Sequence, residues 1–408
     1  MNIRIPFKID ISKNSFFAVT AFLLFGLIPL TSQKLEAVFV AIFILLLIVQ
    51  NFFNVNEEKK EFKFYTINTL LFFVLLFTFF DGFDYLAYKK LEQLVSLLIF
   101  PIIFYLLSNQ KRNEVNKLFK IWQYTFLGST ILLVFVVYYL VYNYSNPRYP
   151  NFDSNLFKAA LSDSSFFSRD PAYISMFINV AILICLDFLS KASKKINKVY
   201  LFLIIIFLLI PIFLFSSKIA ILGIVTCSII YIIISFKKER LPIIISLCLL
   251  FFTTIFLLPS KLNRFTDLFN NNILKRNVEY NSTFVHKETI KCSYNIFKSN
   301  FLFGVGLENT NTSVNNCVRK TFTYNEGVIY NPHNQYLGFA LHSGILALLI
   351  FIYVIYNGLR LSYKNNKFLF LTVVYFCVFF LTENVLERQS GLVLFCFLFN
   401  TIPLIKSE

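Results

Sequence analysis

The sequence is poor in charged residues for its length. Of its 408 residues only 15% are Asp, Glu, Lys or Arg, whereas soluble domains carry about 25%. The hydrophobic share is 57% and includes 53 phenylalanines, more than a globular core of this size needs. Because long apolar runs explain this composition, it argues against an ordinary soluble domain. It predicts an all-α, polytopic integral membrane protein.

Patterns of metal ligands are also missing. The chain has three histidines and seven cysteines, without a Cys-x-x-Cys pair or a His/Cys cluster of the kind that binds zinc. We therefore expect neither a metal nor a cofactor. Five cysteines lie in apolar runs, whereas Cys292 and Cys317 lie in a long polar segment. They could pair if that segment faces an oxidising compartment, but the spacing leaves the pairing open.

Acidic residues are outnumbered 22 to 38 by Lys and Arg, which gives a net charge of +16. Such a surplus can indicate nucleic-acid binding. Here the basic residues occur in short clusters between apolar runs, the pattern of the inside loops of membrane proteins. Placing the N-terminus inside puts more than half of the 38 basic residues inside. The opposite orientation would put the lysine cluster 191–198 outside, so we reject it.

No small-x-small cleavage site follows the basic N-terminal residues Arg4, Lys8 and Lys13. These residues precede an apolar run as in a signal peptide, but further apolar runs come at once. We therefore interpret the first run as an uncleaved span.

About twelve apolar runs are long enough to cross a membrane, which takes about 20 residues of helix. They are 15–31, 35–53, 64–80, 91–108, 119–143, 169–189, 199–215, 218–236, 241–258, 335–357, 368–383 and 389–405. The pair 199–215 and 218–236 is broken only by two serines and could instead form a re-entrant turn. We divide the chain into a bundle of about nine spans (1–258), a large outer loop (259–334) and about three C-terminal spans (335–408).

A Pro-His-Asn sequence follows the large loop, within residues 330–337. Pro332 precedes the expected helix, and we place His333 in its first turn at the membrane surface. An imidazole there can act as a general base, or it can be an interfacial histidine beside an asparagine cap. Upstream, Gly304 and Gly306 flank Val305 and predict a tight turn.

Charged residues also occur where an apolar medium should exclude them. Arg169 opens one span, and Lys218 lies between two. Charges at such positions are costly and usually functional, although both residues could snorkel to the headgroups and Arg169 could pair with Asp170. Outside cations are not needed for topology, so an anionic substrate is the alternative explanation. Glu383, Glu387 and Arg388 lie in the last outer turn, where they could bind sugar hydroxyls, position a helix or be solvated.

Residues 303–306, together with 332–337 and Gly344 beyond them, resemble the family of bacterial O-antigen ligases and O-antigen polymerases. The turn 216–218 is similar to the Ser-Arg turn of the family, with Lys218 in place of Arg. The segment 383–389 is similar to its final loop. The resemblance covers roughly residues 165–400, whereas the N-terminal spans match only in hydropathy.

The resemblance implies a GT-C-like membrane enzyme with one large periplasmic loop, located in the bacterial inner membrane with its active site facing the periplasm. The donor would be a glycan on undecaprenyl pyrophosphate, transferred by inverting, metal-independent attack in the synthesis of surface polysaccharide. A ligase would use lipid A-core as acceptor, and a polymerase another lipid-linked repeat unit. The sequence favours the ligase only slightly. A transporter of lipid-linked sugars and a structural membrane protein are further alternatives.

The resemblance also implies roles for residues. His333 would deprotonate the acceptor hydroxyl. The pyrophosphate would bind Arg169, Lys218 and Lys287. The sugar would be bound or the site supported by Asn334, Tyr336, Glu383, Glu387 and Arg388. Many members carry an Arg near the position of His286 and Lys287, and the resemblance leaves open which of the two replaces it. Many also carry Glu where His342 stands.

Overall fold

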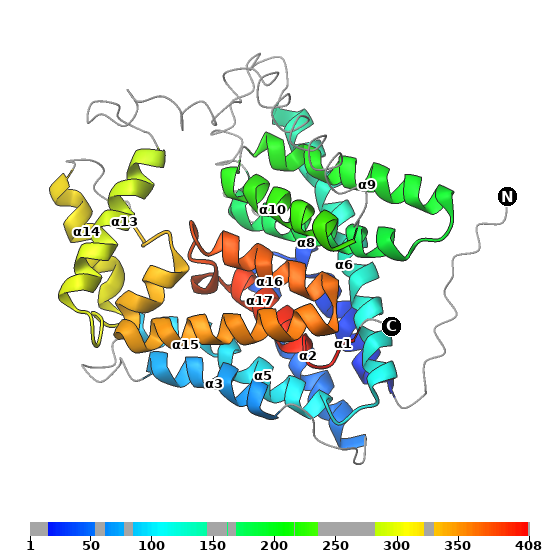
Figure 1. Ribbon diagram of the computed structural model, residues 1–408, viewed down its shortest axis with the longest axis horizontal. Helices are drawn as coiled ribbons and strands as arrows, with labels where there is room; N and C mark the ends of the chain where they lie inside the picture. The colour runs from blue at the N-terminus through cyan, green and yellow to red at the C-terminus, as the bar shows by residue number, and fades with distance from the viewer. Residues whose placement is uncertain are drawn as a thin grey trace.

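The computed structural model describes residues 15–53, 62–76, 85–144, 161, 169–215, 217–235, 282–321 and 330–406. All regular elements within these ranges are helices, and none is a strand (Figure 1). This confirms the prediction of an all-α protein. The predicted span 241–258 and part of the predicted outer loop lie outside the described residues.

Seven helical stretches in the described ranges are long and apolar enough to cross a membrane. Six are α2 (Gln33–Phe53), α6 (Arg112–Tyr144), α8 (Pro171–Lys191), α9 (Lys195–Leu214), α10 (Lys218–Ser235) and α15 (Gln335–Asn365). The seventh, Lys90–Leu107, joins α4 (Tyr85–Leu94) to α5 (Ser96–Leu107). The shorter apolar helices are α1 (Phe16–Gly26), α3 (Phe62–Leu76), α16 (Lys367–Phe379) and α17 (Gln389–Thr401). Every predicted span in the described ranges overlaps one of these helices. The total of twelve remains a prediction.

Helices α9 and α10 are separate elements. The first ends at Leu214 and the second begins at Lys218, and each is long and apolar enough to span. This favours two spans over a re-entrant turn.

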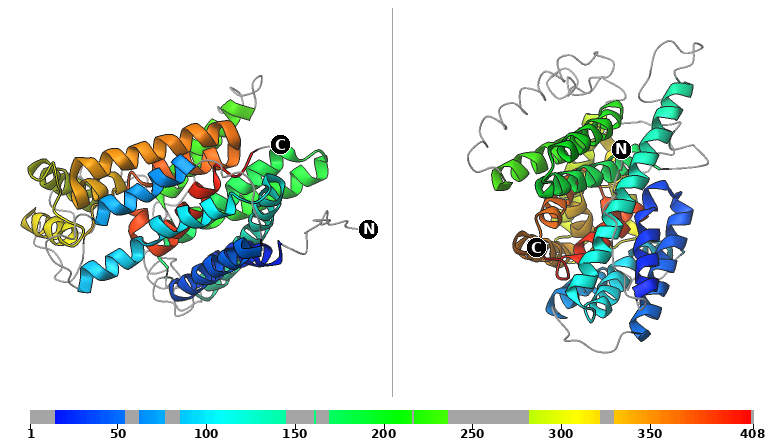
Figure 2. Two further views of the ribbon diagram at one scale, coloured as in Figure 1. Left: turned by 90° about the horizontal axis from the view of Figure 1, so that it is seen from below. Right: turned by 90° about the vertical axis from the view of Figure 1, so that its right-hand side faces the viewer.

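Helix α8 lies at the centre of the bundle. It packs against α6, α9, α10 and α16, and its residues Ile174 to Ile184 are buried. Helix α6 lies between the α1–α2 pair and the α9–α10 pair (Figure 2). Phenylalanines fill both kinds of environment. Phe25, Phe43 and Phe397 pack together in the core, whereas others, such as Phe202, lie exposed on helices of the membrane-spanning type. The sequence is rich in phenylalanine because phenylalanines occupy both the buried and the exposed faces of the helices.

Two helices of the predicted outer loop, α13 (Ser282–Ser299) and α14 (Asn309–Thr321), lie together at one end of the molecule (Figure 1). A disulfide between Cys292 and Cys317 joins them, so the pairing that the sequence left open is formed. Val314, Val318 and the buried Leu341 of α15 pack around it in a small second core. The described part of the loop therefore has its own packed interior.

Helix α15 is kinked at Ser343 and Gly344, whose backbone angles are not helical. The turn 301–306 docks there: Val305 N donates to Leu341 O (2.7 Å), and Ile345 N donates to Phe301 O (2.9 Å). Gly304 and Gly344 both have positive φ, and a Cβ on Gly344 would lie 2.0 Å from Leu302 O. Both glycines are needed for this close approach of two backbones.

Candidate functional site

His333 lies just before α15 and not in its first turn, so that prediction was wrong. The helix begins after Asn334, whose side-chain oxygen caps it by accepting from Leu337 N (2.9 Å). His333 itself has φ +48°, and its N–H donates to Asn331 Oδ1 (3.0 Å). Asparagine side chains favour such local turns. The two asparagines therefore make the helix begin after Asn334, so the imidazole of His333 lies just outside the N-terminal end of α15.

The imidazole of His333 meets two other ionisable side chains. Its Nδ1 lies 3.8 Å from Glu383 Oε2, an electrostatic contact longer than a hydrogen bond. Its ring centroid lies 4.1 Å from that of His286. The side chains of His333 and Glu383 are 24% and 25% exposed, so the pair is accessible and partly screened from water.

His286 comes from α13 and faces His333 from the loop side. Burial lowers its pKa to about 4; the nearby His333 and Lys218 act in the same direction, and Glu383 opposes them. His286 is therefore neutral at physiological pH. The neighbouring Lys287 is exposed. Of the two residues that could replace the family's Arg, His286 is the one in contact with His333.

Lys218 starts α10 and is partly buried. Its charge acts on His286, so the ammonium group lies within electrostatic range of that imidazole. The structure thus brings together Lys218, His286, His333 and Glu383, from four segments that are far apart in the sequence. We call these four residues the His333 cluster.

The loop that carries Glu383 is fastened to the start of α15. Asn334 N donates to Asn384 Oδ1 (2.7 Å), and Leu386 N donates to Gln335 Oε1 (2.7 Å). Asn334 Nδ2 also donates to Leu381 O (3.0 Å). These bonds fix Glu383 relative to His333. Sequence reasoning missed Gln335 and Asn384, since only the close approach of the two segments shows their purpose.

Three other predicted residues have different surroundings. Tyr336 donates to Cys377 O (3.3 Å) on α16 and packs against Phe351, so its hydroxyl is used inside the bundle. Glu387 accepts from Asn384 Nδ2 (2.6 Å). Arg388 is exposed. In the described part of the structure, none of the three forms a hydrogen bond or an ion pair with His333.

Glu387 belongs to a second polar group, which it forms with His342. Its Oε1 lies 3.5 Å from Nε2 of His342, which is 2% exposed. Burial raises the pKa of Glu387, and the positive charge of Lys90 opposes this. Lys90 Nζ donates to Leu307 O (2.5 Å), next to the glycine turn. Sequence reasoning did not single out Lys90, because it is one of two adjacent lysines in an amphipathic helix.

Arg169 is buried and paired. Its side chain is 1% exposed, and Nη2 lies 2.8 Å from Oε2 of Glu36. The guanidinium also donates to Ile28 O (3.1 Å) and Pro29 O (3.3 Å), and lies over the ring of Phe177. Because its charge is neutralised inside the bundle, we leave Arg169 out of the candidate pyrophosphate site. The predicted alternative, a pair with Asp170, is also not formed: Asp170 caps α8 by accepting from Ala172 N.

Metal ligands do not assemble in this part of the structure. Among the described residues, no group of three or more His, Cys, Asp or Glu side chains could hold an ion.

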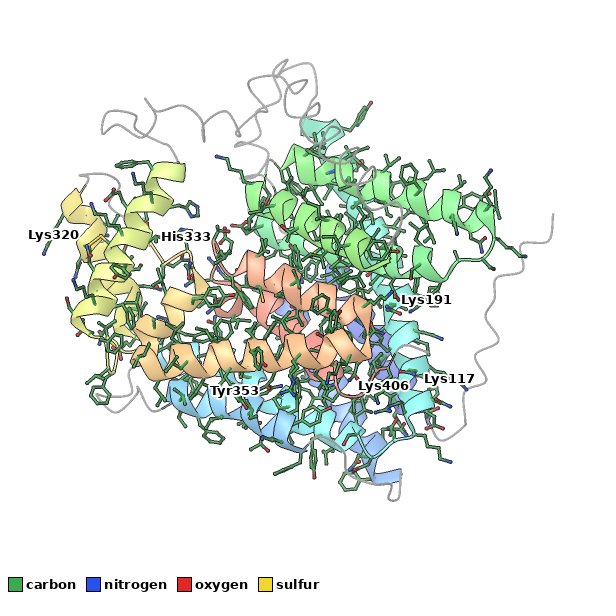
Figure 3. The ribbon with its side chains drawn as sticks, in the orientation of Figure 1. Lys117, Lys191, Lys320, His333, Tyr353 and Lys406 are labelled. Atoms are coloured by element: carbon green, nitrogen blue, oxygen red, sulfur yellow. A yellow bond between two sulfur atoms is a disulfide. The ribbon has the colours of Figure 1, made fainter. Side chains whose placement is uncertain are left out.

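Fold and site define a class: a helical membrane protein with a partly screened cluster of imidazole, ammonium and carboxylate groups at one end of its helices (Figure 3). Residues 201–352 match the family model described as O-antigen ligase, and this match supports the resemblance of the motifs to the O-antigen ligase and polymerase family. The match includes Lys218, His286 and His333 and excludes Arg169 and Glu383. No curated protein matches the chain.

Proposed function

We propose that the protein is a membrane glycosyltransferase that moves a glycan from undecaprenyl pyrophosphate to the hydroxyl of an acceptor sugar. Ligation to lipid A-core is our first assignment, and polymerisation onto a lipid-linked repeat unit is the alternative. The observation that carries the proposal is the His333 cluster, three of whose four members lie inside the family match. We place this cluster on the periplasmic side of the inner membrane.

In the proposed reaction His333 takes the proton of the acceptor hydroxyl through Nε2. Glu383, facing Nδ1 at 3.8 Å, stabilises the imidazolium that forms. The acceptor oxygen then attacks the anomeric carbon from the face opposite the leaving group, which inverts the configuration. The bond between that carbon and the pyrophosphate breaks, and its electron pair stays on the pyrophosphate oxygen.

The leaving pyrophosphate gains negative charge as this bond breaks, and fixed cations stabilise such charge without a metal. Lys218 is our main candidate, because it lies at the start of α10, where the helix dipole adds positive potential. His286 is neutral at physiological pH, so its proposed part is to hold the His333 ring and to hydrogen-bond an oxygen. Lys287 remains a proposal as an outer phosphate contact.

The remaining predicted residues are proposed as supports. Asn334 uses its side chain to cap α15 and to hold the loop of Glu383, and Tyr336 ties α15 to α16. Glu387 supports the same loop through Asn384. Arg388 is exposed and remains a proposed sugar contact.

A transporter of lipid-linked sugars is the competing proposal, and it needs an ionisable coupling group inside the bundle. Asp187, an acidic residue near the end of α8, pairs with Lys191 at 2.8 Å. Glu36 is held by Arg169. Both carboxylates therefore have fixed partners, which supports the transferase.

The test is complementation of a deletion strain, with surface polysaccharide separated on a gel. We expect His333→Ala to lower transfer by about 10²- to 10⁴-fold and Lys218→Gln by about 10²- to 10³-fold. Lys218→Arg keeps the charge and should retain most activity, which makes it the matched control. Equal membrane levels of each variant exclude loss of folding.

The gel also separates the candidate functions. Lipid-linked polymer that accumulates without ligation indicates a ligase, and single repeat units on the core indicate a polymerase. Normal banding with His333→Ala would rule out the catalytic assignment.

A further inference from the structure

A cavity of about 310 Å³ lies at the end of the bundle opposite His333. Its lining includes Lys120 and Gln123 of α6, Lys191 of α8, Asn366 at the start of α16, and Lys406 near the C-terminus. Figure 3 shows Lys191 and Lys406 together at this end, with His333 at the other. Helix α15 runs between the two ends over 31 residues, a distance of about 45 Å.

The lining of the cavity carries a positive surplus. Three lysines and one aspartate contribute, which leaves two positive charges. Asp187 is 6% exposed and neutralises Lys191 at 2.8 Å. The other two lysines of the lining, Lys120 and Lys406, are exposed and approach from different elements.

Neutral polar groups complete the lining. Gln123 is 3% exposed and Asn366 is 6% exposed. Asn366 caps α16 through Leu369 N, so the positive end of that helix dipole also faces this region. Asn116 Oδ1 lies buried in the lining without a hydrogen-bond partner among the described residues. It is an acceptor that a ligand hydroxyl can satisfy.

The positive-inside rule alone does not explain this arrangement. That rule requires basic residues in inside loops, but it does not require them to surround a cavity. Lys117, Lys194 and Lys364 belong to the same predicted inside segments and do not line it. Basic pockets between helices on this side of a membrane are typical sites for anionic lipid headgroups.

We propose that this basic cavity binds the phosphate-bearing, hydroxylated headgroup of an anionic phospholipid, in the leaflet opposite the His333 cluster. Lys120 and Lys406 pair with the phosphate, and Asn116 accepts from a headgroup hydroxyl. The site is separate from glycan transfer and tightens the packing of α6, α8, α16 and the C-terminal segment.

The test uses the full-length protein in a zwitterionic detergent with added lipid. Native mass spectrometry counts the bound lipids, and thermal unfolding measures the stabilisation. Phosphatidylglycerol is compared with phosphatidylcholine of the same acyl chains. We expect phosphatidylglycerol to bind at least tenfold more tightly to the unmodified protein.

The cavity variant Lys120→Gln/Lys406→Gln leaves the Lys191–Asp187 pair intact. The matched control, Lys117→Gln/Lys364→Gln, loses the same charge at exposed positions outside the cavity. We expect the cavity variant to bind phosphatidylglycerol about tenfold more weakly or worse, and the control to bind it like the unmodified protein. Both should unfold at the same temperature as the unmodified protein when only phosphatidylcholine is present.

Equal loss of binding in both variants, or no loss in either, would overturn the proposal. A third arm adds inorganic phosphate at millimolar concentration without lipid. If free phosphate stabilises the protein as much as phosphatidylglycerol does, and the cavity variant loses that effect, the site takes free phosphate and the lipid assignment is wrong.

Discussion

Arg169 and Glu36 form an ion pair that is almost completely withdrawn from solvent, with exposures of 1% and 0%. Oε2 of Glu36 also accepts from Ser390 (2.6 Å) on α17. One carboxylate thus joins α2, the start of α8 and α17. Burial of a charge is costly, and only its partner makes it tolerable. The pair therefore holds these three helices together.

Breaking one side of this pair should destabilise the protein strongly. Glu36→Leu leaves the Arg169 charge buried and unpaired, which costs about 3–5 kcal/mol. We expect a clear fall in the thermal unfolding temperature of the purified protein. The double variant Glu36→Leu/Arg169→Met removes both charges and should recover most of the loss, with transfer activity retained. A double variant that recovers stability but not activity would return Arg169 to the pyrophosphate site.

The pH dependence of stability should report on His286. Its pKa is about 4 in the folded protein against an ordinary value of 6.5, so between these values the unfolded chain binds more protons. Stability should therefore fall as the pH drops from about 6.5 to 4. Thermal unfolding measured across this range should show that His286→Gln flattens the slope. An unchanged slope in that variant would mean that another group carries the dependence.

The sequence could identify His333, since Pro-His-Asn after a polar loop is a local pattern. It could not identify Glu36 as the partner of Arg169, because the two lie 133 residues apart. For the same reason it could not choose between His286 and Lys287. Local sequence patterns identified the unusual residues, whereas only the tertiary structure showed which side chain each of them contacts.

Helix α15 carries the main irregularity among the elements. Its kink at Ser343 and Gly344 opens the backbone so that the turn 301–306 can form two hydrogen bonds with it. The His333 end of α15 is thereby set at a fixed position against α13. The sequence predicted a turn at Gly304, but not that its partner would be Gly344 in the middle of a span.

Substitution of either glycine should disrupt this contact. A Cβ on Gly344 would lie 2.0 Å from Leu302 O, and one on Gly304 would lie 2.3 Å from Leu341 O. We expect Gly344→Ala to destabilise the protein by at least about 2 kcal/mol, because positive φ adds to the clash. The control is Gly128→Ala in α6, where nothing lies within 4 Å of the new atom. It should be neutral or stabilising by up to about 1 kcal/mol.

Thermal unfolding of the two purified variants checks this, together with trypsin sensitivity of the α13–α14 region. Tolerance of Gly344→Ala at the level of Gly128→Ala would show that the two backbones do not need this close approach.

The molecule as a whole has two chemically different ends. One carries α13, α14 and the His333 cluster, and the other carries Lys117, Lys191 and Lys406 (Figure 3). Composition and charge distribution were enough to predict a helical membrane protein. They were also enough to predict that His333 and the inside lysines lie at opposite ends of the helices. The number of spans and the domain boundaries remain predictions, since residues 241–258 lie outside the described ranges.

The predicted orientation can be checked with two exposed lysines at opposite ends. In intact cells, Lys320→Cys on α14 should react with a membrane-impermeant maleimide, and Lys117→Cys on α6 should react only after the membrane is opened. The four free cysteines that the structure describes are buried or partly buried, so the background should be low. The reverse labelling pattern would invert the orientation and move the His333 cluster to the cytoplasmic side.

The disulfide joins Cys292, on the same helix as His286, to Cys317 on α14, and both cysteines pack in one small core with Val305 of the turn that meets α15. A newly made chain cannot form this bond while its thiols remain in a reducing cytosol. We therefore expect the proposed catalytic end to mature only after the loop has been oxidised on the periplasmic side on which we place it. Such an order would keep the transferase silent until it reaches the side of the membrane where its glycans are presented.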